Sequence, residues 1–224
     1  MRQTIKSNKA SGPINFIDLI EDIRACTHCT KDLPLGPRPV LQANPKAKIL
    51  IVGQAPGTAV HATGIPFNDP SGDRLRNWLG VDADQFYNED LFAIVPMGFC
   101  YPGRGKGGDL PPRPECAPMW RTNLLSQLVN IELTIAIGRY AIDWHLDPKK
   151  DPRKDPRKDP KKSRQTKTKM TLQTIVAQWQ DYLPSMVPLP HPSPRNTIWL
   201  RKNPWLEAEI IPTLRTRVAQ ILAG

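Results

Sequence analysis

The stretch Lys48-Ile-Leu-Ile-Val-Gly-Gln-Ala-Pro-Gly57 decides the fold of this chain. Within it, residues 49–52 form an uninterrupted apolar run rich in β-branched side chains, which is typical of a strand buried on both faces of a sheet. Gly53 and Gly57, with Pro56 between them, end that strand in a tight turn where backbone can approach a ligand closely. Because open α/β sheets bind ligands beyond the carboxyl ends of their strands, we expect a functional site at this loop.

Three more apolar runs of the same kind follow, and segments with helical periodicity separate them. The runs cover residues 91–95, 133–138 and 185–189, and Asp69, Pro70 and Gly80 mark the two ends of one intervening helix. Strands that alternate with helices predict an α/β fold, a parallel sheet with helices on both faces. A long segment of Gly, Pro and Arg at 101–114 predicts an irregular, functional loop.

The composition is that of one globular domain. The chain has 224 residues with 39% hydrophobic content, which suffices for a core. No run approaches the ~18 apolar residues of a membrane span, and no apolar stretch follows the charged N-terminus as in a secretory signal. We therefore expect a cytoplasmic protein with no membrane contact, and a monomer, whose domain covers residues 15–224 after a flexible segment 1–14.

The positive charge is concentrated in one tract. Of the net charge of +10, residues 147–169 carry +7, from eleven Lys and Arg against four Asp. Four Asp-Pro-Lys/Arg-Lys repeats place a proline at every fourth position, which excludes a helix, and the tract has no apolar face. It predicts a disordered basic insertion at about 147–169. Basic charge suits a polyanion partner, although a solvated insertion explains the tract equally well.

The four cysteines form a plausible metal site. Cys26 and Cys29 are two residues apart, whereas Cys100 and Cys116 have fifteen residues between them. An even cysteine count without an export signal favours a metal site over disulfides. The wide second pair suits an iron–sulfur cluster better than zinc, which stays as the alternative. Buried reduced thiols are the simpler explanation.

A second candidate loop, Pro190-His-Pro-Ser-Pro-Arg-Asn196, follows the last predicted strand. A histidine between two prolines in such a loop is hard to explain as a core residue, so His191 is predicted to be functional.

Together these residues resemble the uracil-DNA glycosylase superfamily. The resemblance lies in a Gly-x-x-Pro-Gly loop, here 53–57, a His-Pro-Ser loop, here starting at His191, and the spacing from Thr63 to Phe67. The cysteine framework is similar to the iron–sulfur (family 4) branch, and the extended His-Pro-Ser-Pro-Arg-Asn form is similar to the single-strand-selective branch. The order and spacing of all the motifs make the resemblance specific.

The resemblance implies a three-layer α/β/α domain around a four-stranded parallel sheet, and hydrolysis of an N-glycosidic bond in DNA. The base is extruded from the stack into a pocket. By this resemblance, Phe67 would stack on the base, the loop residues Gly53, Ala55, Pro56 and Gly57 would hold its edge, and His191 would stabilise the departing base. Ser193, Arg195 and Asn196 would contact DNA, and Cys26, Cys29, Cys100 and Cys116 would hold a [4Fe-4S] cluster.

Two departures separate the sequence from that family. Gln54 and Ala55 stand where relatives carry Glu, Asp or Asn, and the asparagine that recognises uracil in relatives, expected near the end of the second strand, is replaced around Pro96. Gln54 can orient water but cannot take its proton, so His61 is the nearest candidate for a general base. His61 can also be an ordinary loop histidine, Phe67 a packing residue, and the Gly/Pro loop a bare turn.

Three functions follow from these observations. The first is excision of uracil or another deaminated base, such as hypoxanthine, from DNA. The second is a catalytically inactive nucleic-acid-binding protein with the same fold, which the missing carboxylate favours. The third is hydrolysis of free nucleosides or nucleotides, which needs no contact between Arg195 and DNA.

Overall fold

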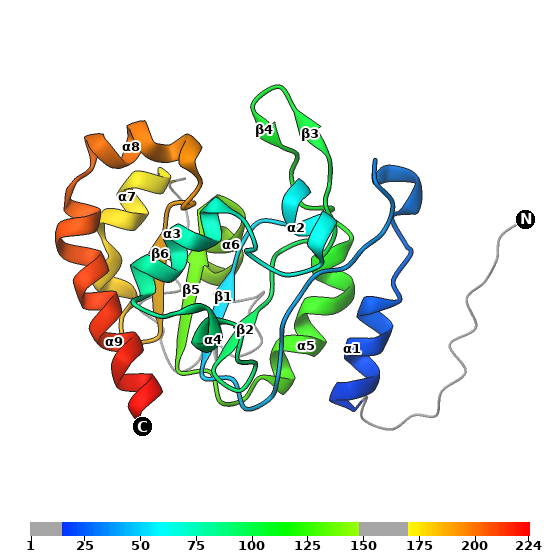
Figure 1. Cartoon of the computed structure of the whole chain (residues 1–224), viewed down its shortest axis with the longest axis horizontal. Coiled ribbons are helices and arrows are strands. Elements are labelled where there is room, and N and C mark those ends of the chain that lie inside the picture. The colour runs from blue at the N-terminus through cyan, green and yellow to red at the C-terminus, as the bar shows by residue number, and fades with distance from the viewer. Residues whose placement is uncertain (1–14, 148–169) are drawn as a thin grey trace, which may run out of the picture.

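The computed structural model describes residues 15–147 and 170–224, where four parallel strands form a sheet in the order β2-β1-β5-β6 (Figure 1). The strands are β1 (Ile49–Val52), β2 (Phe92–Ile94), β5 (Leu133–Ile137) and β6 (Met186–Leu189). The predicted α/β class with a parallel sheet in one domain is confirmed. The last three strands are each a residue or two shorter than predicted. The predicted flexible N-terminus and nearly all of the predicted basic insertion lie outside the described residues.

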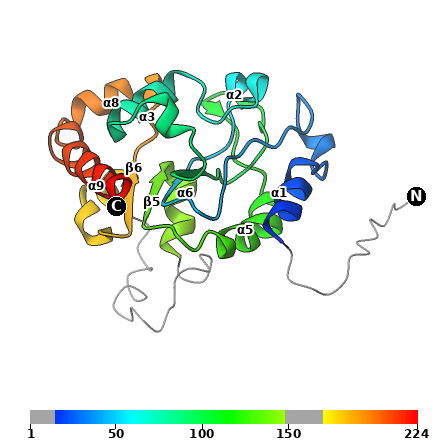
Figure 2. The same ribbon diagram turned by 60° about the horizontal axis from the view of Figure 1, so that its bottom comes forward.

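Side chains alternate between two cores along each strand. In β1, Leu50 and Val52 belong to the core on one face, whereas Ile49 and Ile51 belong to the core on the other, and none of the four is accessible to solvent. Such alternation between two buried faces explains the uninterrupted apolar sequence. Helices cover both faces, with α1 and α5 on one side and α9 on the other (Figure 2).

The helices that pack on the sheet are mostly those predicted from helical periodicity. On the face of Leu50 lie α1 (Phe16–Arg24), α5 (Thr122–Gln127) and α6 (Gly138–Leu146). On the face of Ile49 lie α3 (Pro70–Leu79) and α9 (Ile211–Ala223). Shorter helices are α2 (Thr58–Thr63), α4 (Ala83–Phe86), α7 (Leu172–Ala177) and α8 (Thr197–Lys202). No helix within the described ranges is long and apolar enough to cross a membrane.

The segment 101–114, predicted as an irregular loop, contains a short hairpin instead. Its strands are β3 (Arg104–Gly105) and β4 (Gly108–Asp109), paired antiparallel so that Arg104 faces Asp109. The prediction missed it because the strands have two residues each and no alternation of apolar and polar side chains. The hairpin projects from the top of the molecule, above α2 (Figure 1).

Candidate functional site

A cleft of about 340 Å³ opens beyond the carboxyl ends of β1 and β2. That volume is in the range of pockets that bind small ligands. The first loop (residues 53–57) and Phe67 line one part of it, His191 and Arg195 line another, and Pro96, which follows β2, lines it as well. Two loops far apart in the sequence therefore meet at one site.

The first loop is fixed by hydrogen bonds on both sides. The backbone N–H groups of Met97 and Gly98 donate to the carbonyl oxygens of Gly53 (2.9 Å) and Gln54 (3.0 Å). The side-chain amide of Gln54 donates to the carbonyl oxygen of Leu110 at 2.8 Å. Gln54 lines the cleft, but its amide hydrogens serve to attach the first loop to the segment that follows the hairpin.

Phe67 is held in a strained backbone conformation beside the first loop. Its φ of 55° is in the left-handed region, which typically costs a non-glycine residue about 1–3 kcal/mol. Its ring packs edge-to-face on Phe86, with 6.3 Å between ring centroids, and its Cζ lies 3.4 Å from where a Cβ on Gly53 would stand. The ring is thereby fixed against the backbone of Gly53, as an aromatic platform requires.

Gly72 in α3 controls that conformation. A Cβ at residue 72 would lie 1.7 Å from the carbonyl oxygen of Phe67, so Gly72→Ala must displace Phe67 or the first turn of α3. Such overpacking typically costs 1–3 kcal/mol or more, which corresponds to a fall in Tm of at least about 2 °C for a domain of this size. The measurement is the Tm of Gly72→Ala compared with that of Gly107→Ala. The second variant is the control, because a Cβ at residue 107 meets nothing within 4 Å. Equal Tm values would show that Gly72 does not control Phe67.

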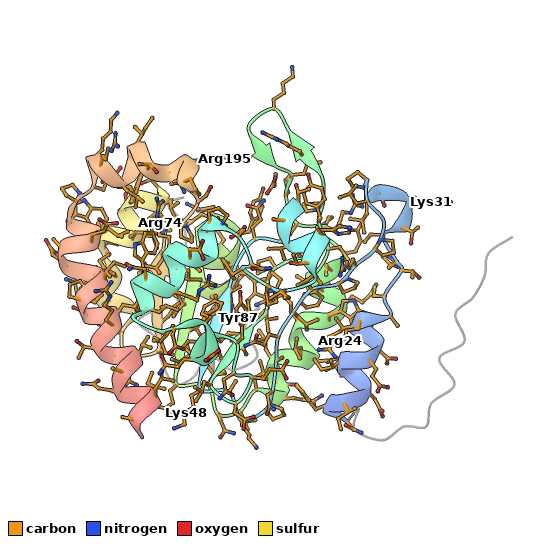
Figure 3. All side chains as sticks on the ribbon, viewed as in Figure 1. Arg24, Lys31, Lys48, Arg74, Tyr87 and Arg195 are labelled. Atoms are coloured by element: carbon orange, nitrogen blue, oxygen red, sulfur yellow. The ribbon has the colours of Figure 1, made fainter. Side chains whose placement is uncertain are left out.

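The second loop is held in place by side chains from α3 and from its own end. Arg74 donates from Nη1 to the carbonyl oxygens of Pro192 (3.1 Å) and Ser193 (3.2 Å). The side-chain amide of Asn196 donates to the carbonyl oxygen of His191 at 2.8 Å. In Figure 3, Arg195 lies at the top of the view between α8 and the hairpin, and Arg74 lies on α3.

The protonation state of His191 follows from its surroundings. Burial lowers the pKa of His191 below its ordinary value, although the negative charges of Asp69 and Asp109 counteract part of that effect. The ring is therefore neutral at pH 7. Its Nδ1 accepts a hydrogen bond from the backbone N–H of Ser193 at 3.2 Å, so the single proton of the neutral ring is on Nε2. His191 is thus a neutral hydrogen-bond donor.

Arg195 connects the second loop with the hairpin across the mouth of the cleft. Its Nη1 lies 3.0 Å from where a Cβ on Gly108 would stand, so the guanidinium rests against β4. The side chain is exposed, and it provides a positive charge where a phosphate could approach.

The sequence matches the family model of the uracil DNA glycosylase superfamily over residues 41–215. The chain belongs to this superfamily. Both cleft loops, Phe67 and the hairpin lie in the matched region, whereas Cys26 and Cys29 precede it. The resemblance seen in the sequence is confirmed at the level of the superfamily, whose members act on DNA.

The structure brings most of the predicted site residues of this superfamily member together, but not all. Those that line the cleft are Gly53, Gln54, Ala55, Pro56, Gly57, Phe67, His191, Ser193 and Arg195. His61 does not line it. His61 is on α2, and its ring faces that of Tyr101, with 6.2 Å between centroids. Asn196 holds the backbone of the second loop instead of lining the cleft.

Two carboxylates in the cleft were not among the predicted site residues. Asp69 and Asp109 both line it. Asp69 was recognised only as the N-cap of α3, where its side chain accepts a hydrogen bond from the backbone N–H of Gly72 at 2.9 Å. Asp109 stands in a Gly-rich segment whose sequence gives no sign of where it folds. The only sequence signal is a polar residue in a long loop.

The four cysteines gather at a separate pocket beside α1. Cys26, Cys29, Cys100 and Cys116 all line it, together with apolar residues that include Phe99. Burial raises the pKa of Cys100 to about 11 and that of Cys116 to about 12. The backbone N–H of Phe99 donates to the sulfur of Cys116 at 3.4 Å. Within residues 15–147 and 170–224, no group of three or more His, Cys, Asp or Glu side chains is arranged around a single metal ion.

Proposed function

We propose that this protein is a DNA glycosylase, which hydrolyses the N-glycosidic bond between a deaminated base and deoxyribose. Uracil is the first candidate, and hypoxanthine or another lesion is the alternative because Pro96 takes the place of a base-recognising asparagine. The observation that carries the proposal is the meeting of Phe67, the first loop and His191 in one cleft of a superfamily that acts on DNA.

Binding of the base would use the parts of the cleft that are already rigid. A base must leave the duplex stack, at a cost of a few kcal/mol, before it can enter such a pocket. The ring of Phe67, fixed against Gly53, offers a face for stacking. The first loop, bonded on both sides, offers backbone polar groups to the edge of the base. Arg195 at the mouth would contact a neighbouring phosphate.

Cleavage would depend on His191. Breaking the N-glycosidic bond leaves negative charge on the base, including its carbonyl oxygen. A neutral imidazole with its proton on Nε2 can donate a hydrogen bond to that oxygen and stabilise it as it becomes more negative. Burial favours this role because a hydrogen bond is stronger in an environment from which water is excluded.

We further propose that the four cysteines hold an iron–sulfur cluster, with zinc as the alternative. The donors suit a cluster, since four thiols line one pocket with an apolar lining. In the described residues they do not surround a single ion, so a zinc ion would require them to move closer together. The N–H of Phe99 also donates to one sulfur, as is usual for thiolates that bind a cluster. The bound cluster would join the end of α1 to the segment after β2 and serve to hold the structure together.

A panel of labelled oligonucleotides tests the proposed activity. Each oligonucleotide carries one lesion (uracil, hypoxanthine, xanthine or an oxidised base) in single-stranded and duplex form. The purified protein is expected to generate alkali-labile sites with at least one of them, and the same products should be absent with undamaged DNA. If none of the substrates yields an alkali-labile site, the protein is not a DNA glycosylase for these lesions.

The absence of an acid from the first loop supports a second candidate function, that of a catalytically inactive DNA-binding protein. Neither Gln54 nor Ala55 is an acid, and the amide of Gln54 is bonded to the hairpin segment. Such a protein would bind abasic or single-stranded DNA with an affinity that falls steeply with salt, without cleavage. Binding without alkali-labile product in the panel would establish this candidate.

A further inference from the structure

The first loop brings no carboxylate to the cleft, although hydrolysis of a glycosidic bond requires a water molecule to be oriented and to lose a proton. The amide of Gln54 donates to the carbonyl oxygen of Leu110 at 2.8 Å and lies 3.5 Å from that of Asp109. An amide cannot accept a proton at neutral pH, and here its hydrogens are already occupied. A carboxylate that acts on this water would have to come from another element.

The hairpin places a carboxylate above the same loop. Asp109 is the last residue of β4, and its Oδ2 lies 3.7 Å from where a Cβ on Gly57 would stand. Asp109 also lines the cleft that holds Phe67 and His191. The bonds from Gln54 to the backbone of Asp109 and Leu110 fix the end of the hairpin relative to the first loop. Gln54 is therefore a positioning residue for Asp109.

The electrostatic surroundings support this placement. The charges of Asp69 and, to a smaller extent, Asp109 raise the pKa of His191 against the stronger lowering by burial, so both carboxylates act on the histidine across the cleft. In the described parts of the chain, the carboxylate of Asp109 has no hydrogen-bond or ion-pair partner. Its oxygens are free to accept hydrogen bonds from a water molecule.

Asp69 is the competing carboxylate, and its position makes it a weaker candidate. Its Oδ1 accepts the hydrogen bond that caps α3, from the N–H of Gly72 at 2.9 Å. That oxygen is therefore committed to the helix cap, and using it to bind a water molecule would break the cap.

We infer that Asp109 is the catalytic carboxylate of this enzyme, supplied by the hairpin in place of the acid that the first loop lacks. The inference rests on the proposed glycosylase function. As the bond from C1′ to the base nitrogen breaks, its electron pair leaves with the base, whose oxygen is held by Nε2–H of His191. The carboxylate stabilises the positive charge on the sugar and orients a water molecule. The water oxygen bonds to C1′, and its proton passes to Asp109 and on to the departed base through solvent.

The test compares Asp109→Asn and Asp69→Asn with the wild-type protein. Both variants remove one negative charge near His191, and asparagine retains the cap at residue 69. Single-turnover excision is measured with a lesion that wild type cleaves, and affinity is measured with an oligonucleotide that carries a tetrahydrofuran abasic analogue. Asp109→Asn is expected to lower the excision rate by at least about 100-fold, the lower limit for loss of a general base, with affinity within a few-fold of wild type. Asp69→Asn should lower the excision rate much less than Asp109→Asn does. Asp84→Asn, an exposed charge on α4 at the opposite end of the strands (Figure 1), controls for net charge.

The outcomes distinguish failure of the inference about Asp109 from failure of the proposed function. If wild type cleaves a lesion but Asp109→Asn cleaves it within a few-fold of the same rate, Asp109 is not catalytic and the proposed function stands. The same conclusion follows if Asp69→Asn is the slower variant. Loss of both excision and affinity in Asp109→Asn would show a structural role, and Asp109→Glu, which keeps the charge, would then remain as inactive as Asp109→Asn. If wild type cleaves no lesion, the proposed function fails and the inference fails with it.

Discussion

Replacing His191 with alanine is expected to slow base excision by about 10²–10³-fold, the usual effect of removing one donor that stabilises a developing oxyanion. The structure gives the donor its properties. The backbone N–H of Ser193 donates a hydrogen bond to Nδ1 of His191 at 3.2 Å, which leaves the ring proton on Nε2. Burial lowers the pKa of His191 and keeps the ring neutral. The measurement is single-turnover excision of the lesion that wild type prefers, with affinity for an abasic analogue measured beside it.

The variant His191→Gln is the matched comparison, because a glutamine amide is a neutral donor of similar reach. It should retain more activity than His191→Ala while binding DNA equally well. An excision rate for His191→Ala within a few-fold of wild type would exclude His191 as the group that stabilises the departing base.

The lowered pKa of His191 also predicts how stability depends on pH. In the unfolded chain its pKa returns to the ordinary value of ~6.5, so below that pH the unfolded state binds more protons than the folded state. The stability from the buried neutral ring is present above pH ~6.5 and is lost as the pH falls toward the lowered value. The Tm of wild type should therefore fall more between pH 7.5 and 5.5 than that of His191→Gln, whose side chain does not titrate.

The fold could be predicted from the sequence because its signals are local. The apolar run at β1 (Ile49–Val52) requires burial on both faces, and the start of α3 is marked by Asp69 and Pro70, whose roles as N-cap and first helical residue the structure confirms. The two cleft loops could be brought together as well, since each follows a parallel strand and parallel strands end at the same edge of the sheet.

The rest of the site could not be predicted because it depends on tertiary contacts. The two-residue strands of the hairpin have no hydrophobic pattern, and nothing near Asp109 in the sequence shows that it folds over Gly57. The same holds for Gln54, whose hydrogen bond to Leu110 spans 56 positions. The ring of His61, eight positions from Gly53 in the sequence, lies beside that of Tyr101 and does not line the cleft, which no local sequence signal shows.

Replacing Cys116 with serine is expected to have the largest effect on stability, provided that the four cysteines hold a metal centre. Serine has nearly the same shape as cysteine but does not bind iron as a thiolate does. Loss of a structural metal is one of the few single changes that typically cost more than 4 kcal/mol, which corresponds to a fall in Tm of about 8–16 °C for a chain of this length. The variant should also lose the brown colour and the iron that we expect in the purified wild-type protein.

A comparison between metal-loaded and metal-free protein separates the cluster from simple packing. Cys116 also lies against the core of α1 and α5, so a polar oxygen in its place carries some cost without any metal. Wild type freed of metal by a chelator should therefore unfold near the Tm of Cys116→Ser, and adding chelator to Cys116→Ser should change little. The cation that leaves the wild-type protein identifies the centre as iron or zinc. If untreated wild type contains neither metal, and the chelator leaves its Tm unchanged, the four cysteines are buried thiols. The junction between α1 and the segment after β2 then depends on apolar packing alone.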